Sequence, residues 1–168
     1  MKQSDELWQK ATRGCPCGFF GDELRICRCT PIQMARYRDR LSGPLRDRLD
    51  MTVEVPALAP DGLQDAPGGE ASSAVRLRVV AARERQRARY AALAIRTNAE
   101  LTPALMSRCC GVDAHGRRVL TAAARRPSLS ARGYDRVRKV ARTIADLAAA
   151  DAIHADHLAE ALQFRILT

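Results

Sequence analysis

A chain of 168 residues is long enough for one ordinary domain or two small ones. Aromatic residues make up only 4% of it, so the core must consist of Ala, Leu and Val, which favours helices packed on helices. The net charge of +9, with 25 Arg among 28 basic residues, indicates a polyanionic partner such as nucleic acid or a nucleotide. A merely basic surface is the alternative.

Targeting signals are missing from the sequence. Residues 1–10 hold no apolar run of the kind found in secretory signals, and no stretch approaches the length of a membrane span. We therefore expect a cytoplasmic protein with no membrane partner, whose six Cys residues are thiols or metal ligands rather than disulfides.

Two Cys-x-Cys pairs lie on either side of a nine-residue loop that contains two glycines. The four sulfur ligands of the motif are Cys15, Cys17, Cys27 and Cys29. Four thiolates in two close pairs are able to close a tetrahedral zinc site, which would fix a short glycine-containing loop. The alternative is a cluster of buried or reducible thiols. Cys109 and Cys110 are expected on a helix, as packing residues.

A helix is expected to start at Thr30-Pro31 and to end near Leu41, before a turn at Ser42-Gly43-Pro44. Alternating apolar residues then predict a short, half-buried strand at Leu49–Val55. Arg48 lies just before that strand, on a rigid corner from which a guanidinium is well placed to reach a phosphate on another molecule. A salt bridge to Asp47 or Asp50 is the alternative for Arg48.

Residues 57–72 indicate a linker, since they hold several Pro and Gly and no periodicity. The linker separates residues 1–56 from residues 73–168, where the pattern becomes wholly helical. The expected helices run from Ser72 or Ser73 to about Asn98, from Thr102 to about Cys109, from Asp113, from Ser130, and from about Ala155 to Phe164.

Two features of the helical part bear on anion binding. The helix at 73–98 carries seven Arg and one acid, which suits either contact with phosphates or a solvated face on a packed helix. Arg132 lies in the first turn of the helix that Ser130 caps, where the helix dipole disfavours a cation. A ligand phosphate nearby would relieve that cost, and simple exposure to water is the alternative.

Taken together, these stretches resemble the magnesium-chelatase-like AAA+ ATPases of the ComM/YifB type. The resemblance is carried by the motifs Cys-Pro-Cys-Gly-Phe-Phe-Gly-Asp, Cys-Arg-Cys-Thr-Pro, Arg-Tyr-Arg-Asp-Arg-Leu-Ser-Gly-Pro-Leu-Arg-Asp-Arg-Leu-Asp, Leu-Ser-Ala-Arg-Gly-Tyr-Asp-Arg and His-Leu-Ala-Glu-Ala-Leu-Gln-Phe-Arg. They occur in the family's order and cover nearly the whole chain from Cys15 onward.

The resemblance implies a mainly α chain made of the end of an AAA+ core, with one or two short strands, followed by a helical-bundle lid. It also implies a ring-forming, hexameric, ATP- and Mg-dependent motor that acts on DNA as a helicase in branch migration during natural transformation. Carried onto this sequence, Arg48 corresponds to the arginine finger that serves a neighbouring subunit. Arg132 corresponds to the sensor-2 arginine of the lid.

This sequence departs from the family pattern in three places. It contains no Walker A or Walker B segment, Arg13-Gly14 stands where the family has Asn-Pro, and Arg46 replaces the usual Leu. We therefore expect a truncated subunit that does not hydrolyse ATP by itself. The alternatives are a basic, non-catalytic module that binds DNA or associates with a related ring, and a pseudogene remnant.

Overall fold

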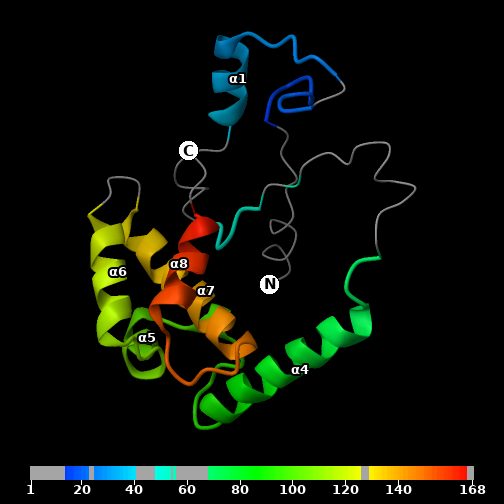
Figure 1. Cartoon of the computed structure of the whole chain (residues 1–168). Coiled ribbons are helices and arrows are strands. Elements are labelled where there is room, and N and C mark those ends of the chain that lie inside the picture. Colours follow the sequence, from blue (N-terminus) through cyan, green and yellow to red (C-terminus); the bar gives the residue numbers. More distant parts are fainter. Residues whose placement is uncertain are drawn as a thin grey trace. The chain divides into compact units, whose positions relative to one another are not determined.

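The computed structural model describes residues 14–22, 25–40, 48–53, 55, 68–125 and 129–165. The chain divides into two compact units, Met1–Leu49 with Val53–Ala66 and Asp50–Thr52 with Pro67–Thr168. The described residues form helices and no strand, so the expected mainly α fold class is confirmed (Figure 1).

The described residues of the first unit include the cysteine loop and the helix α1 (Pro31–Arg38). Thr30 caps α1 as expected: its hydroxyl accepts from the Gln33 N–H at 3.3 Å, and the Gln33 amide oxygen accepts from the Thr30 N–H at 2.9 Å. None of the residues of α1 is buried. The predicted turn at residues 42–44 lies outside the described residues.

The expected strand at Leu49–Val55 is wrong for the residues that the structure describes there, 49–53 and 55. A strand needs a neighbouring strand for its backbone groups, and the described part of the chain contains none. The Thr52 N–H instead donates to the Phe164 carbonyl at 2.9 Å. Val53 and Val55, expected to be half-buried, are 61% and 86% exposed.

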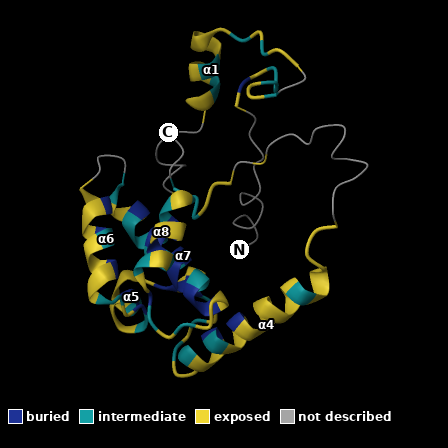
Figure 2. Cartoon of the chain, in the orientation of Figure 1, coloured by how far each residue is buried: buried dark blue, intermediate teal, exposed yellow. Residues whose placement is uncertain are grey.

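The second unit is a helical bundle arranged around one central helix (Figure 1). Its elements are α4 (Ser72–Arg89), the 3-10 helix η1 (Asn98–Glu100), α5 (Pro103–Cys109), α6 (Ala114–Ala124), α7 (Ala131–Leu147) and α8 (Ala155–Gln163). Helix α7 contacts every other element of this set. Figure 2 shows the consequence, since buried residues concentrate along α7 and on the faces turned toward it.

Small residues let the central helices approach closely. Ala141 and Ala145 of α7 and Ala161 of α8 are completely buried, beside the larger buried side chains of Val137 and Leu158. Aliphatic side chains make up most of this core, which also contains the buried Tyr90 and Met106.

Side-chain caps start three helices of the bundle where the sequence predicts them. Thr102, Asp113 and Ser130 accept hydrogen bonds from the N–H groups of Leu105, Gly116 and Gly133, at 3.4, 2.6 and 3.1 Å. Helix α4 differs, because Ala71 is its N-cap and neither Ser72 nor Ser73 caps it through a side chain.

Helix α4 also ends earlier than expected, at Arg89 rather than near Asn98. The helix ends there, and Asn98, which is only 3% exposed, lies in the core instead of continuing α4. Its amide accepts from the Tyr90 hydroxyl at 2.6 Å and donates to Thr143 and Asp146 at 3.0 and 2.9 Å. These bonds fix the end of α4 against α7.

A buried ion cluster joins α4 to α7. The Asp146 carboxylate accepts from Arg89 at 3.0 Å and lies 3.1 Å from Arg142, whose guanidinium also donates to the carbonyls of Ala150 and Asp151. Burial raises the pKa of Asp146, but hydrogen bonds from Arg89 and Asn98 and the charge of Arg142 outweigh burial and hold the pKa below its ordinary value. Asp146 is therefore ionised between two cations.

Candidate functional site

The cysteine loop reverses direction at two glycines in the left-handed region, Gly18 with φ 84° and Gly21 with φ 79°. The Gly18 N–H donates to the Cys15 carbonyl at 3.2 Å, and the Asp22 N–H donates to the Phe19 carbonyl at 3.2 Å. These two tight turns bring the Cys-x-Cys pairs back to each other across the loop.

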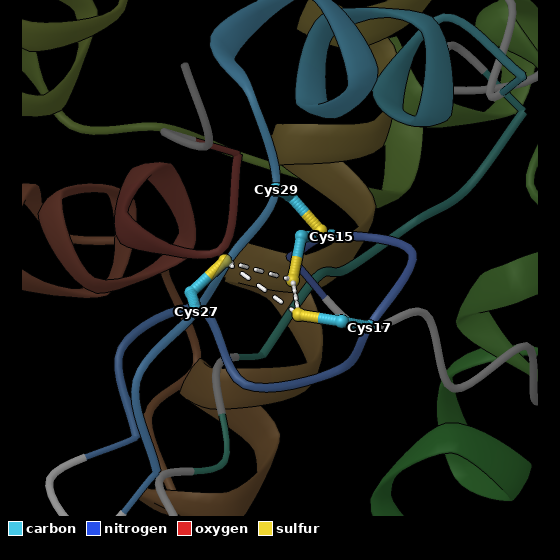
Figure 3. Close-up of side chains that lie close together, drawn as sticks. All are labelled: Cys15, Cys17, Cys27 and Cys29. Carbon is cyan, nitrogen blue, oxygen red and sulfur yellow. Dashed lines mark hydrogen bonds between the residues drawn. The ribbon is translucent and has the colours of Figure 1, made fainter.

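All four cysteine side chains turn their sulfur atoms toward a common centre, as Figure 3 shows. The Sγ atoms of Cys15, Cys17, Cys27 and Cys29 lie within 4.8 Å of one another. Three of the separations are short: 3.3 Å for Cys15–Cys17 and 3.6 Å for both Cys17–Cys27 and Cys15–Cys27. A tetrahedral tetrathiolate with metal–sulfur bonds of about 2.3 Å has sulfurs about 3.8 Å apart, close to the spacing observed here.

The thiols of Cys15 and Cys27 in this cluster have very different pKa values. Burial raises the pKa of the Cys15 thiol, but hydrogen bonds from the Cys17 and Cys27 thiols outweigh burial and lower its pKa to about 6. A backbone hydrogen bond from Cys29 lowers the pKa of Cys27, but burial and the neighbouring sulfurs raise it to about 12. Four sulfurs so close together do not all ionise unless a cation offsets their repulsion.

Arg48 is exposed, and no hydrogen bond or ion pair joins it to another described residue. The alternative of a salt bridge to Asp50 does not occur, because the Asp50 carboxylate pairs with Arg136 of α7. Asp47 lies outside the described residues.

Arg132 is exposed in the first turn of α7, which contains no acidic residue. The guanidinium of Arg165 lies next to this turn, because a Cβ on Gly133 would meet the Arg165 Nη2 atom at 2.9 Å. The amino-terminal end of α7 is therefore rich in positive charge, to which the helix dipole adds.

The structure brings the four cysteines together in one cluster. Arg48 and the cysteines belong to the first unit, and Arg132 belongs to the second.

Sequence reasoning missed two charged features of the second unit. One carboxylate oxygen of Asp113 caps α6, and the other lies 2.8 Å from the His154 Nδ1 atom. This contact joins the starts of α6 and α8. A shallow hollow on α6 is lined by Arg117, Arg118 and Arg125. Arg125 follows Arg118 by seven residues and Arg117 by eight, a spacing that places all three on one face of a helix, and this stretch contains no acid. That pattern was the signal by which the sequence could have indicated a basic surface.

Two family models match the chain, and together they cover most of it. The model described as the C-terminal part of magnesium chelatase subunit ChlI matches residues 69–165. The model described as magnesium chelatase subunit ChlI matches residues 7–63.

Curated bacterial proteins match over most of this chain. It is 43% identical over 142 residues to the protein YifB of Salmonella typhimurium and 41% identical over 141 residues to the competence protein ComM of Haemophilus influenzae, with 83% of this chain covered in both. It is 38% identical over 155 residues to the protein Rv2897c of Mycobacterium tuberculosis, with 92% covered. These matches span only 27%, 27% and 30% of the three relatives.

None of the helices in the described part of the chain combines the length and the apolar character that crossing a membrane requires.

Proposed function

Because this chain belongs to the magnesium chelatase ChlI-like family that includes ComM and YifB, we propose that it is the carboxyl-terminal portion of an ATP-driven ring subunit. In this proposal residues 1–56 are the end of an AAA+ core, residues 57–72 are a linker, and residues 73–168 are the helical lid. The ring is a hexamer of homologous subunits, and it moves DNA as a helicase in branch migration during natural transformation. The name of one relative, competence protein ComM, supports the link to natural transformation.

Arg48 is the arginine finger of this proposal and acts in trans on ATP and Mg bound by a neighbouring subunit. The observation that supports it is that Arg48 is exposed and has no ion pair among the described residues. A guanidinium that is already neutralised by a carboxylate would stabilise the charge of a transferring phosphoryl group poorly.

Arg132 is the sensor-2 arginine and contacts the γ-phosphate of ATP from the lid. Its support is its place, exposed in the first turn of α7 with no acid in that turn. A phosphate at that point would accept from the free N–H groups of the helix as well as from the guanidinium.

The 168-residue sequence has no Gly-x-x-x-x-Gly-Lys-Ser/Thr loop, so the chain alone lacks the means to hold ATP for hydrolysis. The test is complementation. A full-length ComM-type ring protein whose own arginine finger is replaced by Ala should regain ATPase activity when this chain is added. The Arg48→Ala chain should restore none, and Arg40→Ala, another exposed arginine of the same unit, should restore it fully.

Two results would contradict this function. One is ATP turnover by the purified chain alone. The other is equal complementation by the native chain and by Arg48→Ala, which would favour a basic, non-catalytic module that only associates with the ring.

A structural zinc ion in the cysteine loop is a second proposal, and the convergence of four sulfurs supports it. Cys15, Cys17, Cys27 and Cys29 would complete a closed tetrahedral site, with no position left for substrate. Such a site would hold the loop that leads into α1, a helix without any buried residue of its own.

Elemental analysis of protein purified without chelator tests the zinc proposal. We expect one zinc per chain for the native protein and for Cys109→Ser, whose sulfur lies outside the cluster, and much less for Cys27→Ser. A zinc content near zero, with four freely titrating loop thiols, would contradict the site.

A further inference from the structure

The arginines of this chain differ in whether a carboxylate already neutralises them. On α4, Arg78 pairs with Glu70, Arg85 with Asp151, Arg87 with Glu84, and Arg89 with Asp146. Most of the charge on the most arginine-rich helix is therefore compensated within the second unit. Helix α4 is a weaker candidate for binding a polyanion than its sequence suggests.

Helix α6 shows the opposite arrangement. Its sequence Ala-His-Gly-Arg-Arg-Val-Leu-Thr-Ala-Ala-Ala contains no acid, and Arg117, Arg118 and Arg125 at its end are all exposed. None of the three has an ion pair with a described residue. The Arg117 guanidinium donates to the Val112 carbonyl at 2.7 Å, which orients the side chain but leaves its charge uncompensated.

The three arginines share the outward face of α6. Gly116, Leu120 and Ala123 are buried and turn the opposite face toward the core. Between the arginines, Ala114, Thr121 and Ala122 are small and leave a shallow hollow in the surface. A chain of phosphates is able to lie in that hollow with guanidinium groups at both ends.

The lining of the hollow selects among anionic partners. It has no aromatic and no large aliphatic side chain, so it offers neither a stacking surface for single-stranded bases nor an anchor for a protein. Arg118 and Arg125 lie about 10.5 Å apart along the helix axis, and duplex DNA carries a charge about every 1.7 Å of its axis. Several phosphates of one duplex therefore fall within reach of both arginines.

We propose that the outward face of α6, with Arg118 and Arg125 at its centre, is a binding surface for the phosphate backbone of duplex DNA. This inference rests on the proposed DNA-directed function and names the part of the chain that contacts the polymer. The contact reads charge and not base sequence, since only phosphates are engaged.

The test measures binding of the full 168-residue chain to a fluorescein-labelled 20-base-pair duplex by anisotropy, between 50 and 200 mM salt. The variant Arg118→Ala/Arg125→Ala should bind at least about tenfold more weakly at 100 mM salt. Its log–log salt slope should fall by about 1.8, because each lost phosphate contact removes about 0.9 of a released counterion. Arg118→Lys/Arg125→Lys should keep the native slope, since lysine retains the charge.

The matched control is Arg78→Ala/Arg87→Ala, which removes the same charge from α4, where both arginines have carboxylate partners. It should change the affinity less than threefold. All four arginines are exposed, so replacing them should leave the bundle folded. Circular dichroism of each variant checks that it does.

The possible failures are distinguishable. If the native chain binds the duplex but the α6 variant binds like the α4 control, the surface is wrong and the DNA-directed function stands. If the native chain binds no duplex even at 50 mM salt, both are overturned. If polyglutamate binds as tightly as DNA and the α6 variant loses both, the assignment to nucleic acid is overturned.

Discussion

The carboxylate of Asp50 pairs with the guanidinium of Arg136, although 86 positions of sequence separate the two residues. Both side chains are partly buried, with 30% and 23% of their surface exposed. Together with the hydrogen bond from Thr52 to Phe164, this pair attaches residues 50–52 to the helical bundle. The segment that follows the proposed arginine finger is therefore held by α7 and α8.

Replacing Asp50 by Asn should lower the free energy of unfolding of the second unit by about 1 kcal/mol, because a partly buried ion pair loses its charge. Urea denaturation measures the change. Asp39→Asn is the control, since Asp39 is exposed and has no ion pair with a described residue, and it should have no measurable effect. Equal stabilities of the two variants would mean that the Asp50–Arg136 pair contributes nothing.

Replacing Asp146 by Asn should be far more costly, about 3 to 5 kcal/mol, because the completely buried Arg142 is left beside Arg89 without a negative partner. Thermal and urea unfolding should both show the loss. Glu84→Gln removes a carboxylate from an exposed pair with Arg87 and should cost less than about 1 kcal/mol. A mild effect of Asp146→Asn would show that the cluster adjusts when its charge is removed.

His157 should make the second unit less stable as the solution becomes acidic. Its Nδ1 atom accepts the His154 N–H at 3.1 Å, and burial lowers the pKa of His157, with help from the charges of His154 and Arg142. The stabilising contribution of neutral His157 is therefore present above the unfolded-state pKa of about 6.5 and is lost as the pH falls through the lower folded-state pKa.

The variant His157→Gln separates this contribution from other acid effects, because a glutamine at the third helical position accepts the same N–H without titrating. The free energies of unfolding measured with urea at pH 7.5 and pH 5 should differ less for His157→Gln than for the native chain, by about the 1 kcal/mol of a helix cap. His115→Gln, at an exposed position of α6, should leave the native difference unchanged. A native-like difference in His157→Gln would exclude this histidine as the cause.

Gly116 should not tolerate a side chain, although alanine is the better helix former. A Cβ at this position would lie 2.7 Å from Val112 Cγ1 and 2.8 Å from Leu158 Cδ1, inside the contact between α6 and α8. The overpacking should outweigh a helix-propensity gain of about 1 kcal/mol and leave Gly116→Ala about 1 to 2 kcal/mol less stable. Gly111→Ala, which meets no atom within 4 Å, is the control and should be neutral.

Local signals in the sequence predicted the starts of most helices correctly, because a cap depends only on a few neighbouring residues. Thr30, Thr102, Asp113 and Ser130 all cap the helices that they were expected to cap. The four loop cysteines were also predicted as one group, since two close pairs joined by a short loop have few other arrangements.

Features that depend on distant partners were not predictable from the pattern. The alternation at Leu49–Val55 is typical of a strand, but a strand also needs a neighbour, and Thr52 bonds to Phe164 instead. The early end of α4 depends on Asn98 reaching Asp146, 48 positions away, and no glycine or proline marks that break. The arginines of α4 were conspicuous in the sequence, whereas their carboxylate partners became evident only in the fold.

The pairing of Val112 with Ile153 as an isolated parallel bridge also constrains the order in which the bundle assembles. The Ile153 N–H donates to the Gly111 carbonyl at 2.9 Å, and the Ile153 carbonyl accepts from Asp113 at 3.3 Å. Closing this contact orders a loop of about 40 residues, whereas α7 and α8 are consecutive helices that meet after a short turn. We therefore expect the α7–α8 hairpin to form early and α6 to dock last, which makes the amide protons of Asp113 and Ile153 the ones that report the final step of folding.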